Sequence, residues 1–471
     1  MTAREHQHRS QRRSTMEAIV GWKHNHFTDK SFLLILAVIV GLLSGTGAFL
    51  LKHIIMLLSS WLTAPFSSSG PNWFLLALPL IGILITGIYT RYILRADISA
   101  GTAKIRNDLS TRNYLLPGNL MYSSIVASSI TIGFGGSAGA EGPIAYTGAA
   151  IGSNIGRWFK MPKEMLMILI GCGAGAGIAG IFKAPIGGVL FTLEVLRLEL
   201  TTFSVIALIV ACLTAAMTAY VLSGFTIDLD YFHYTPVDSD MLVLVIALGI
   251  FCGLYSVYYS YIMEKIEGFF KSLKNPWVKN IIGGVIVSVV VFLFPSLYGE
   301  GYASIGKIIN GDPAAILSGS FLAADGARPW IIVLMAAGVM LSKCFATSTT
   351  NTSGGVGGEF APTLFAGAFA GYFFAETLNL LFGLGLPAGK FAFLGMAGVM
   401  AGAIRAPLMA IFLTVEMTGA YTLLLPVLIT ASISFATVRL FSRHSFFTKR
   451  APRHFKLPDS LTQNTPDEKA Q

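Results

Sequence analysis

The sequence predicts an all-α polytopic membrane protein whose second half repeats the first. Three observations lead to this prediction: a low share of charged residues, apolar runs interrupted by glycine and proline, and an internal duplication. The chain has 471 residues, of which 54% are hydrophobic and 12% charged, and its mean hydropathy is +0.67. Soluble domains carry roughly 25% charged residues, so this composition places the chain among membrane proteins.

The apolar runs follow one another along almost the whole chain. Several are shorter than the ~20 residues that cross a bilayer as a straight helix, and glycine or proline breaks many of them. No long water-soluble segment separates them, so we expect one transmembrane domain over 31–441, with repeat halves at about 31–225 and 241–441. The runs lie at about 32–62, 72–94, 119–134, 143–158, 164–180, 184–222, 241–270, 280–297, 330–346, 360–384, 390–403, 406–419 and 421–441.

Basic residues concentrate at both ends of the chain, which has a formal net charge of +9. Residues 1–30 carry six basic and three acidic residues, and residues 439–471 carry seven and three. Because basic segments stay on the cytoplasmic side of a membrane, we expect cytoplasmic ends at 1–30 and 442–471 in a multi-pass protein of the cell (inner) membrane. The basic residues form no stripe on a soluble domain, so we expect no nucleic acid as a partner.

The second half of the chain repeats the first. FKAPIGGVLFTLEVL (182–196) aligns with IRAPLMAIFLTVEMT (404–418) at an offset of 222 residues, and GGSAGAEGP (135–143) aligns with GGVGGEFAP (354–362) at an offset of 219. Corresponding short segments that glycine and proline interrupt indicate a binding site near the middle of the membrane. The identities of the first pair include Ala184/Ala406, Pro185/Pro407, Thr192/Thr414 and Glu194/Glu416.

The second aligned pair predicts two glycine-rich loops that each lead into a helix inside the membrane. Pro143 and Pro362 suit the first turn of a helix, where an N–H group is not needed. A helix N-terminus exposes unpaired N–H groups with partial positive charge, and glycine lets a ligand approach the backbone. Two such N-termini would bind an anion without any full positive charge. Close helix packing is the alternative use of these glycines.

Glu141 is the acid in the first of these loops, and Phe360 stands at the matching position of the second. An ionised carboxylate at an anion site competes with the anion, and a protonated one releases the site. An intramembrane acid is a functional candidate by default, with helix packing as the alternative. We therefore expect Glu141 to link proton binding to anion passage.

These motifs, in this order and spacing, resemble those of the CLC family of voltage-gated chloride channels and chloride/proton antiporters, over about residues 30–450. GSAGAEGP is similar to the family's G-x-E-G-P stretch, GGEFAP to its G-x-F-x-P stretch, and KAPIGGVLFTLE to the segment after the first-half motif. The resemblance implies a fold of two inverted-topology repeats of tilted, broken helices. It also implies a homodimer in membrane lipid, with one pore per subunit for chloride and protons, and it implies that Glu141 is the gating glutamate. Only about thirty polar residues follow Arg439, so we expect a bacterial-type member without cytoplasmic CBS domains.

The resemblance also implies the anion-binding positions. Ala100 falls where the family usually has a serine hydroxyl, and Phe447 falls where it usually has a tyrosine hydroxyl. Ser99 is the candidate substitute donor. The central site would then depend on backbone N–H groups, and the side chain of Glu359 should point away, since a second charge facing the anion is costly. The full set of anion-binding positions is Ala100, Gly139, Ala140, Gly142, Glu359, Phe360, Ala361 and Phe447.

A third departure from the family concerns protons. Antiporters of the family commonly have an inward-facing glutamate directly after the position of Glu194, and this chain has Val195 there. Glu194 shares its context with Glu416, so we interpret it as structural. Together the three departures predict weak chloride binding and weak proton coupling, in a channel or an antiporter. Fluoride export is the alternative, because the fluoride-exporting branch of the family also alters the serine and tyrosine positions.

Two other classes of protein compete with an anion transporter. An inverted-repeat secondary transporter for a small organic or cationic substrate should show more buried acids to pair with a cation. A membrane receptor or assembly protein should lack repeat-matched loops and should have a soluble domain. The sequence shows no catalytic constellation and no metal-ligand spacing, and Cys172, Cys212, Cys252 and Cys344 stand far apart in apolar runs. We therefore expect no enzyme, no cofactor and no metal.

Overall fold

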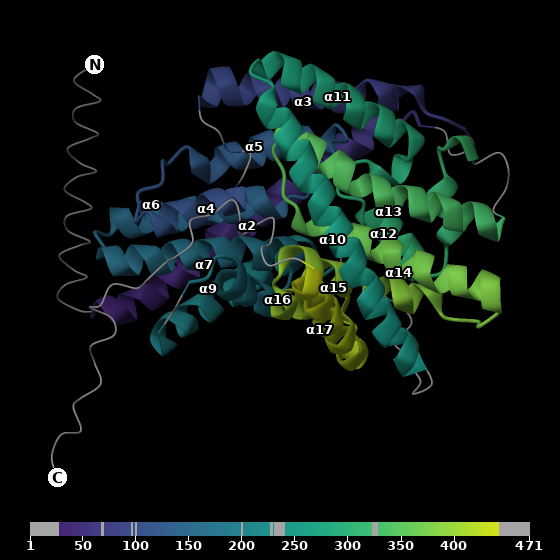
Figure 1. Cartoon of the computed structure of the whole chain (residues 1–471). Coiled ribbons are helices and arrows are strands. Elements are labelled where there is room, and N and C mark those ends of the chain that lie inside the picture. The colour runs from purple at the N-terminus through teal and green to yellow at the C-terminus, as the bar shows by residue number, and fades with distance from the viewer. Residues whose placement is uncertain are drawn as a thin grey trace, which may run out of the picture.

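The computed structural model describes residues 28–66, 70–95, 98, 101–198, 201–226, 229, 241–322 and 328–441. Two sets of helices follow one another in this part of the chain (Figure 1). The first set is α2 (Asp29–Thr63), α3 (Leu78–Ile88), α4 (Gly101–Ser110), α5 (Leu120–Gly133), α6 (Glu141–Trp158), α7 (Lys163–Phe182), α8 (Pro185–Leu190) and α9 (Thr202–Leu222). The second is α10 (Leu242–Ser272), α11 (Pro276–Leu293), α12 (Tyr302–Ile309), α13 (Pro329–Thr352), α14 (Phe360–Phe382), α15 (Ala388–Ile404), α16 (Pro407–Thr418) and α17 (Leu424–Phe441).

The two sets pack in the same way, which confirms the duplication predicted from the sequence. Helix α6 lies along α7 as α14 lies along α15, and α2 packs on α9 as α10 packs on α17 (Figure 1). The closest approaches also correspond. Gly148 of α6 meets Gly173 of α7, and Gly367 of α14 meets Gly395 of α15, each pair so tightly that a Cβ on either glycine would overlap the facing carbonyl.

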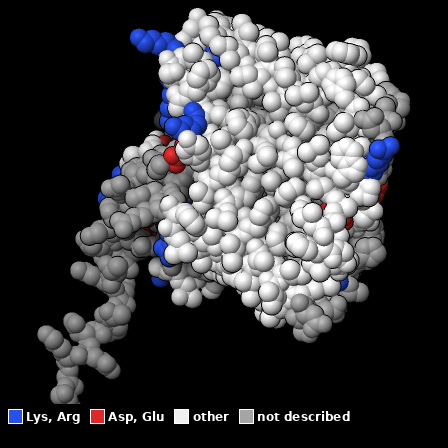
Figure 2. Space-filling model, turned by 45° about the vertical axis from the view of Figure 1, so that its right-hand side comes forward, with Lys and Arg blue, Asp and Glu red and all other residues white. Residues whose placement is uncertain are grey.

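The length and composition of the helices fit a membrane. Among the described residues, nine helices are long and apolar enough to span a bilayer. Four further apolar helices are shorter, namely Leu120–Gly133, Pro185–Val195, Ala388–Ile404 and Pro407–Thr418. Figure 2 shows a face of the molecule that is mostly free of charged side chains, with lysine and arginine near its edges. The predicted mixture of full and broken spans is therefore confirmed.

The apolar run at 184–222 is a broken element rather than one helix. Helix α8 continues as a wider turn through Phe191–Val195, and the backbone reverses at Arg197, whose φ is +56°. Helix α9 then begins after Thr201, whose side chain accepts a hydrogen bond from the N–H of Ser204 at 3.4 Å. Hydrophobicity alone does not reveal this break, because both pieces are apolar.

The two repeats are tied together by a reciprocal pair of glutamates. The carboxylate of Glu194 accepts hydrogen bonds from the N–H groups of Leu408 (3.3 Å) and Met409 (2.7 Å), at the start of α16. The carboxylate of Glu416 accepts from the N–H groups of Ile186 (3.1 Å) and Gly187 (2.8 Å), at the start of α8. Each glutamate thus satisfies orphan donors at the N-terminus of the other repeat's helix.

Candidate anion-binding site

The two glycine-rich loops meet at the centre of the molecule. The N–H of Gly139 donates to the carbonyl of Gly358 at 3.1 Å, and the N–H of Gly358 donates to the carbonyl of Gly139 at 2.6 Å. The bridge is antiparallel, and its two glycines are equivalent in the repeat alignment. Gly135 and Gly354, also equivalent, have φ values of +92° and +113° that suit glycine. The loops therefore bring the N-termini of α6 and α14 together.

The carboxylate of Glu141 reaches from α6 to the N-terminus of α14. Its Oε1 accepts hydrogen bonds from the N–H of Phe360 at 2.5 Å and from the N–H of Ala361 at 3.1 Å. The side chain is only 1% exposed, and its Oε2 has no hydrogen-bond partner. At a helix N-terminus such N–H groups have no acceptor within the helix and carry partial positive charge, so the carboxylate lies where an anion would bind.

Two further N–H groups of the first loop have partners in this arrangement. The N–H of Gly139 is used in the bridge to Gly358, and the N–H of Ala140 donates to the Oε1 of Glu300 at 3.0 Å. Gly142 lies against the second loop, where a Cβ would be 3.1 Å from the Cα of Gly358. Phe360 and Ala361 therefore supply the donors that the Glu141 carboxylate and an incoming anion would share.

Three predicted positions, Ser99, Ala100 and Phe447, lie outside the described residues. Gly101, directly after Ala100, lies against α6, because a Cβ on it would be 2.6 Å from the carbonyl oxygen of Gly142. Val195 is buried, at the end of the wider turn that follows α8.

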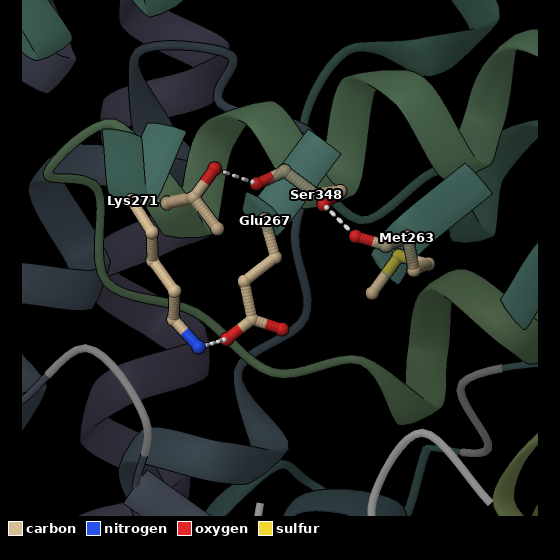
Figure 3. Close-up of polar contacts among 5 residues, drawn as sticks. Met263, Glu267, Lys271 and Ser348 are labelled. Atoms are coloured by element: carbon tan, nitrogen blue, oxygen red, sulfur yellow. Dashed lines mark hydrogen bonds and ion pairs between the residues drawn. The ribbon is translucent and has the colours of Figure 1, made fainter. Parts of the chain in front are cut away.

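A cavity of about 450 Å³ leads to this meeting point. Near its inner end it touches Gly142, Gly358, Glu359 and Phe360, and toward its mouth it is lined by basic and polar side chains. Figure 3 shows part of that lining, where Lys271 pairs with Glu267 at 2.9 Å on α10, beside α13, whose Ser348 hydroxyl donates to the Met263 carbonyl at 3.2 Å. The mouth residues are Lys104, Asn107, Glu267, Lys271, Lys279, Asn351 and Thr352. A positively charged approach of this kind attracts anions.

Sequence reasoning missed two charged residues beside Glu141. Lys343 of α13 is fully buried, and its Nζ donates to the hydroxyl of Ser137 at 2.8 Å. Glu300 lies in the loop between α11 and α12, and its carboxylate accepts a hydrogen bond from the N–H of Ala140. Lys343 is the lysine within the apolar run at 330–346, and an intramembrane charge is the signal that would have identified it.

The described residues contain no group of three or more His, Cys, Asp and Glu side chains that would hold a metal ion. The four cysteines are buried and unpaired. The chemistry at the loop junction is therefore that of carboxylates, an ammonium and backbone N–H groups.

This fold and this site define a class of protein: a membrane-spanning transport protein of two inverted repeats, whose helix N-termini meet at a buried carboxylate. The family described as Voltage gated chloride channel matches residues 81–439. The chain belongs to this family, as the motifs had indicated.

Similar proteins agree with this assignment. The chain is 28% identical over 439 residues to the voltage-gated ClC-type chloride channel ClcB of Salmonella typhi, covering 89% of this chain and 99% of that protein. It is 25% identical over 448 residues to the H(+)/Cl(-) exchange transporter ClcA of Vibrio cholerae, covering 92% of each. A solved structure of a slow cyanobacterial Cl-/H+ antiporter aligns with a TM-score of 0.75 at 25% identity, over 88% of this chain and 96% of that one. A CLC-type fluoride/proton antiporter shares the fold, with a TM-score of 0.72 at 23% identity over 89% and 98% of the two chains.

Proposed function

We propose that this protein carries chloride across the membrane through a path that the carboxylate of Glu141 opens and closes. The observation that supports this most directly is the position of that carboxylate, on the N–H groups of Phe360 and Ala361. The ClcB and ClcA relatives, named as a chloride channel and a proton/chloride exchanger, support the same substrate. We expect transport without enzymatic catalysis.

The side chain of Glu141 can adopt two states, one bound to the N-terminus of α14 and one released from it. While Glu141 is ionised, it occupies two donors that a chloride ion would need and repels that ion. A proton removes the negative charge, the hydrogen bonds to Phe360 and Ala361 weaken, and the side chain can leave the α14 N-terminus. Chloride then takes the free donors. The ionised carboxylate and chloride are therefore alternatives at one place, and proton binding to Glu141 permits anion passage.

The degree of proton coupling is a separate part of the proposal. Val195 offers no second acid to carry protons, and its side chain is buried. Water in the cavity of about 450 Å³ is the remaining route for protons to the loop junction. We therefore propose that proton coupling is weak, so that transport is closer to a leaky exchanger or a channel than to strict antiport.

We further propose a homodimer in the inner membrane, with both ends of the chain in the cytoplasm. The basic stretches at 1–30 and 439–471 support this orientation. The mouth of the cavity would face the cytoplasm as well. Its residues Lys271 and Lys279 flank the junction of α10 and α11, and Lys104 lines the same cavity. Residues 91–112 around Lys104 carry five basic and two acidic residues, so they are expected on the cytoplasmic side as well.

The deciding experiment reconstitutes the protein in liposomes loaded with chloride and records chloride efflux and external pH together. The proposal expects chloride efflux with fewer protons moved than a tightly coupled exchanger would move. Liposomes loaded with fluoride form the second arm. Faster efflux of fluoride than of chloride would reassign the substrate, and no efflux of either anion would refute anion transport.

A further inference from the structure

A second set of charges lies next to Glu141, among residues that do not line the cavity. Its central member is Lys343 of α13, which is 0% exposed. The Nζ of Lys343 donates to the Ser137 hydroxyl at 2.8 Å and lies 3.5 Å from the carbonyl oxygen of Gly299 and 4.4 Å from the centre of the Phe365 ring. A buried ammonium is costly unless nearby charge compensates it, so this position requires negative charge close by.

Glu300 supplies part of that negative charge. It follows Gly299 directly, and its Oε1 accepts the N–H of Ala140 at 3.0 Å. Ala140 is the residue before the first turn of α6. Glu300 therefore accepts a hydrogen bond at the N-terminus of α6, as Glu141 does at the N-terminus of α14. The same loop brings the Glu300 carboxylate to the N-terminus of α6 and the carbonyl of Gly299, one residue earlier, to Lys343.

The loop that carries Glu300 is anchored at three points, one at the end of α5 and two in the first glycine-rich loop. The hydroxyl of Tyr298 donates to the carbonyl of Gly133 at 2.7 Å. Lys343 joins Gly299 to Ser137, and Glu300 joins Ala140. Loss of the Glu300 charge alone would therefore leave the loop in place, which makes the charge testable without unfolding the site.

The position of Glu300 relative to the membrane follows from α11. This helix of 18 residues begins beside Lys279 at the mouth of the cavity and ends shortly before Glu300. A helix of that length covers about 27 Å, so Glu300 lies far from the cavity mouth, at the loop junction where it bonds to Ala140. The charges of Glu300 and Lys343 thus act on an ion at the loop junction.

We propose that Lys343 and Glu300 are a fixed pair of opposing charges that sets the anion affinity of the path, with Lys343 attracting the anion and Glu300 opposing it. This inference rests on the proposed role of Glu141. The two neighbouring carboxylates and one ammonium give this region a net negative charge while Glu141 is ionised. When Glu141 releases the N–H groups of α14, Lys343 compensates the arriving anion, and Glu300 limits how tightly the anion is held.

Removing the charge of Glu300 and removing the charge of Lys343 should change the chloride affinity in opposite directions. A purely structural role of these residues would not produce such a difference. Glu300→Gln keeps the acceptor for Ala140 and removes the charge, so chloride should bind about five- to tenfold more tightly, the size expected for one nearby unit charge that is partly screened. Lys343→Met keeps the length of the side chain and removes the ammonium, so chloride should bind more weakly by a similar factor. The Glu300→Gln/Lys343→Met double variant should return close to the wild-type affinity.

The measurement is calorimetric titration of the purified full-length protein with sodium chloride, with chloride efflux from liposomes as the second readout. Glu376→Gln is the matched control, because Glu376 is a half-buried acid of α14 that lines a separate cavity with Tyr372 and Lys390. Equal chloride affinity in wild type and Glu300→Gln would overturn the inference, even if Lys343→Met does not fold. Glu141→Gln distinguishes failure of this inference from failure of the proposed function. If Glu141→Gln alters chloride binding and Glu300→Gln does not, only the inference about Lys343 and Glu300 fails. If neither variant alters chloride binding, the proposed function fails too.

Discussion

The Oε1 of Glu141 lies 2.5 Å from the backbone nitrogen of Phe360, so a carboxylate of the first repeat closes the helix N-terminus of the second. The two residues are equivalent in the repeat alignment at an offset of 219. The second repeat therefore supplies the N–H donors for an anion, and the first repeat supplies the carboxylate that competes with the anion for them.

Replacing Glu141 by glutamine should abolish proton coupling and make anion efflux insensitive to pH. The amide has the shape of the protonated carboxyl group and cannot ionise, so it competes poorly with chloride at every pH. Chloride efflux and external pH, recorded together on liposomes between about pH 4.5 and 7.5, provide the measurement. Glu376→Gln should keep the wild-type profile. A Glu141→Gln protein whose efflux varies with pH as the wild type does would refute the gating role.

A methyl group at position 358 should push the Glu141 carboxylate out of its place. The Cβ of Gly358→Ala would overlap the Oε1 of Glu141 and would lie 2.7 Å from the backbone nitrogen of Gly142. Overpacking of this kind costs about 1–3 kcal/mol, so we expect a lower unfolding temperature together with a weaker pH dependence of efflux. Thermal unfolding in detergent and efflux assays give the two readouts.

Gly268→Ala is the control for this prediction. Gly268 lies in α10, and a Cβ there would meet nothing within 4 Å. Alanine should slightly stabilise that helix because it restricts the unfolded chain. If Gly358→Ala matches Gly268→Ala in both readouts, the close contact between position 358 and Glu141 does not exist in the working protein.

The loops could be predicted from the sequence because the duplication identifies them twice, whereas the central acid occurs in the first repeat alone. Equivalent glycines at 135 and 354 have positive φ, and those at 139 and 358 form the bridge, so local sequence and structure agree there. Glu141 is an acid in an apolar context, and such a residue requires compensation. These features depend on short stretches of chain.

The contacts of the charges around Glu141 could not be predicted, since they depend on long-range packing. Glu300 meets Ala140 across 160 residues, and Lys343 meets Ser137 across 206. The hypothesis of an anion site without any full positive charge is therefore incomplete, because Lys343 lies next to it. The context that Glu194 shares with Glu416 predicts a structural role for Glu194. Only the packing of α8 on α16 reveals that Glu194 and Glu416 each cap a helix of the other repeat. Hydrophobic periodicity gives little help in such a chain, because protein-facing and lipid-facing sides are both apolar.

Removing either member of the Glu194 and Glu416 pair should destabilise the protein without changing the pH dependence of transport. Glu194→Ala leaves the N–H groups of Leu408 and Met409 without acceptors, and Glu416→Ala does the same to Ile186 and Gly187. Loss of a helix cap costs about 0.5–2 kcal/mol, so each variant should unfold several degrees earlier than the wild type. Thermal unfolding and the pH profile of efflux are the measurements. A Glu194→Ala variant that unfolds like the wild type but moves protons differently would instead assign Glu194 to the proton path.

The last prediction concerns the homodimer, which we expect to form through the apolar faces at about 184–215 and 404–435. Leu213 and Leu408 are exposed in the single chain, on α9 and α16 respectively. Ile85 of α3 is equally apolar and exposed, so it serves as the lipid-facing control. In a two-fold dimer the same surface of both copies meets; a cysteine at position 213 or 408 should therefore cross-link two copies with a short bifunctional thiol reagent. The native cysteines are buried and should not react. Cross-linking in membranes, followed by denaturing electrophoresis, is the measurement, and preferential linking from Ile85→Cys would move the interface to the 72–94 segment.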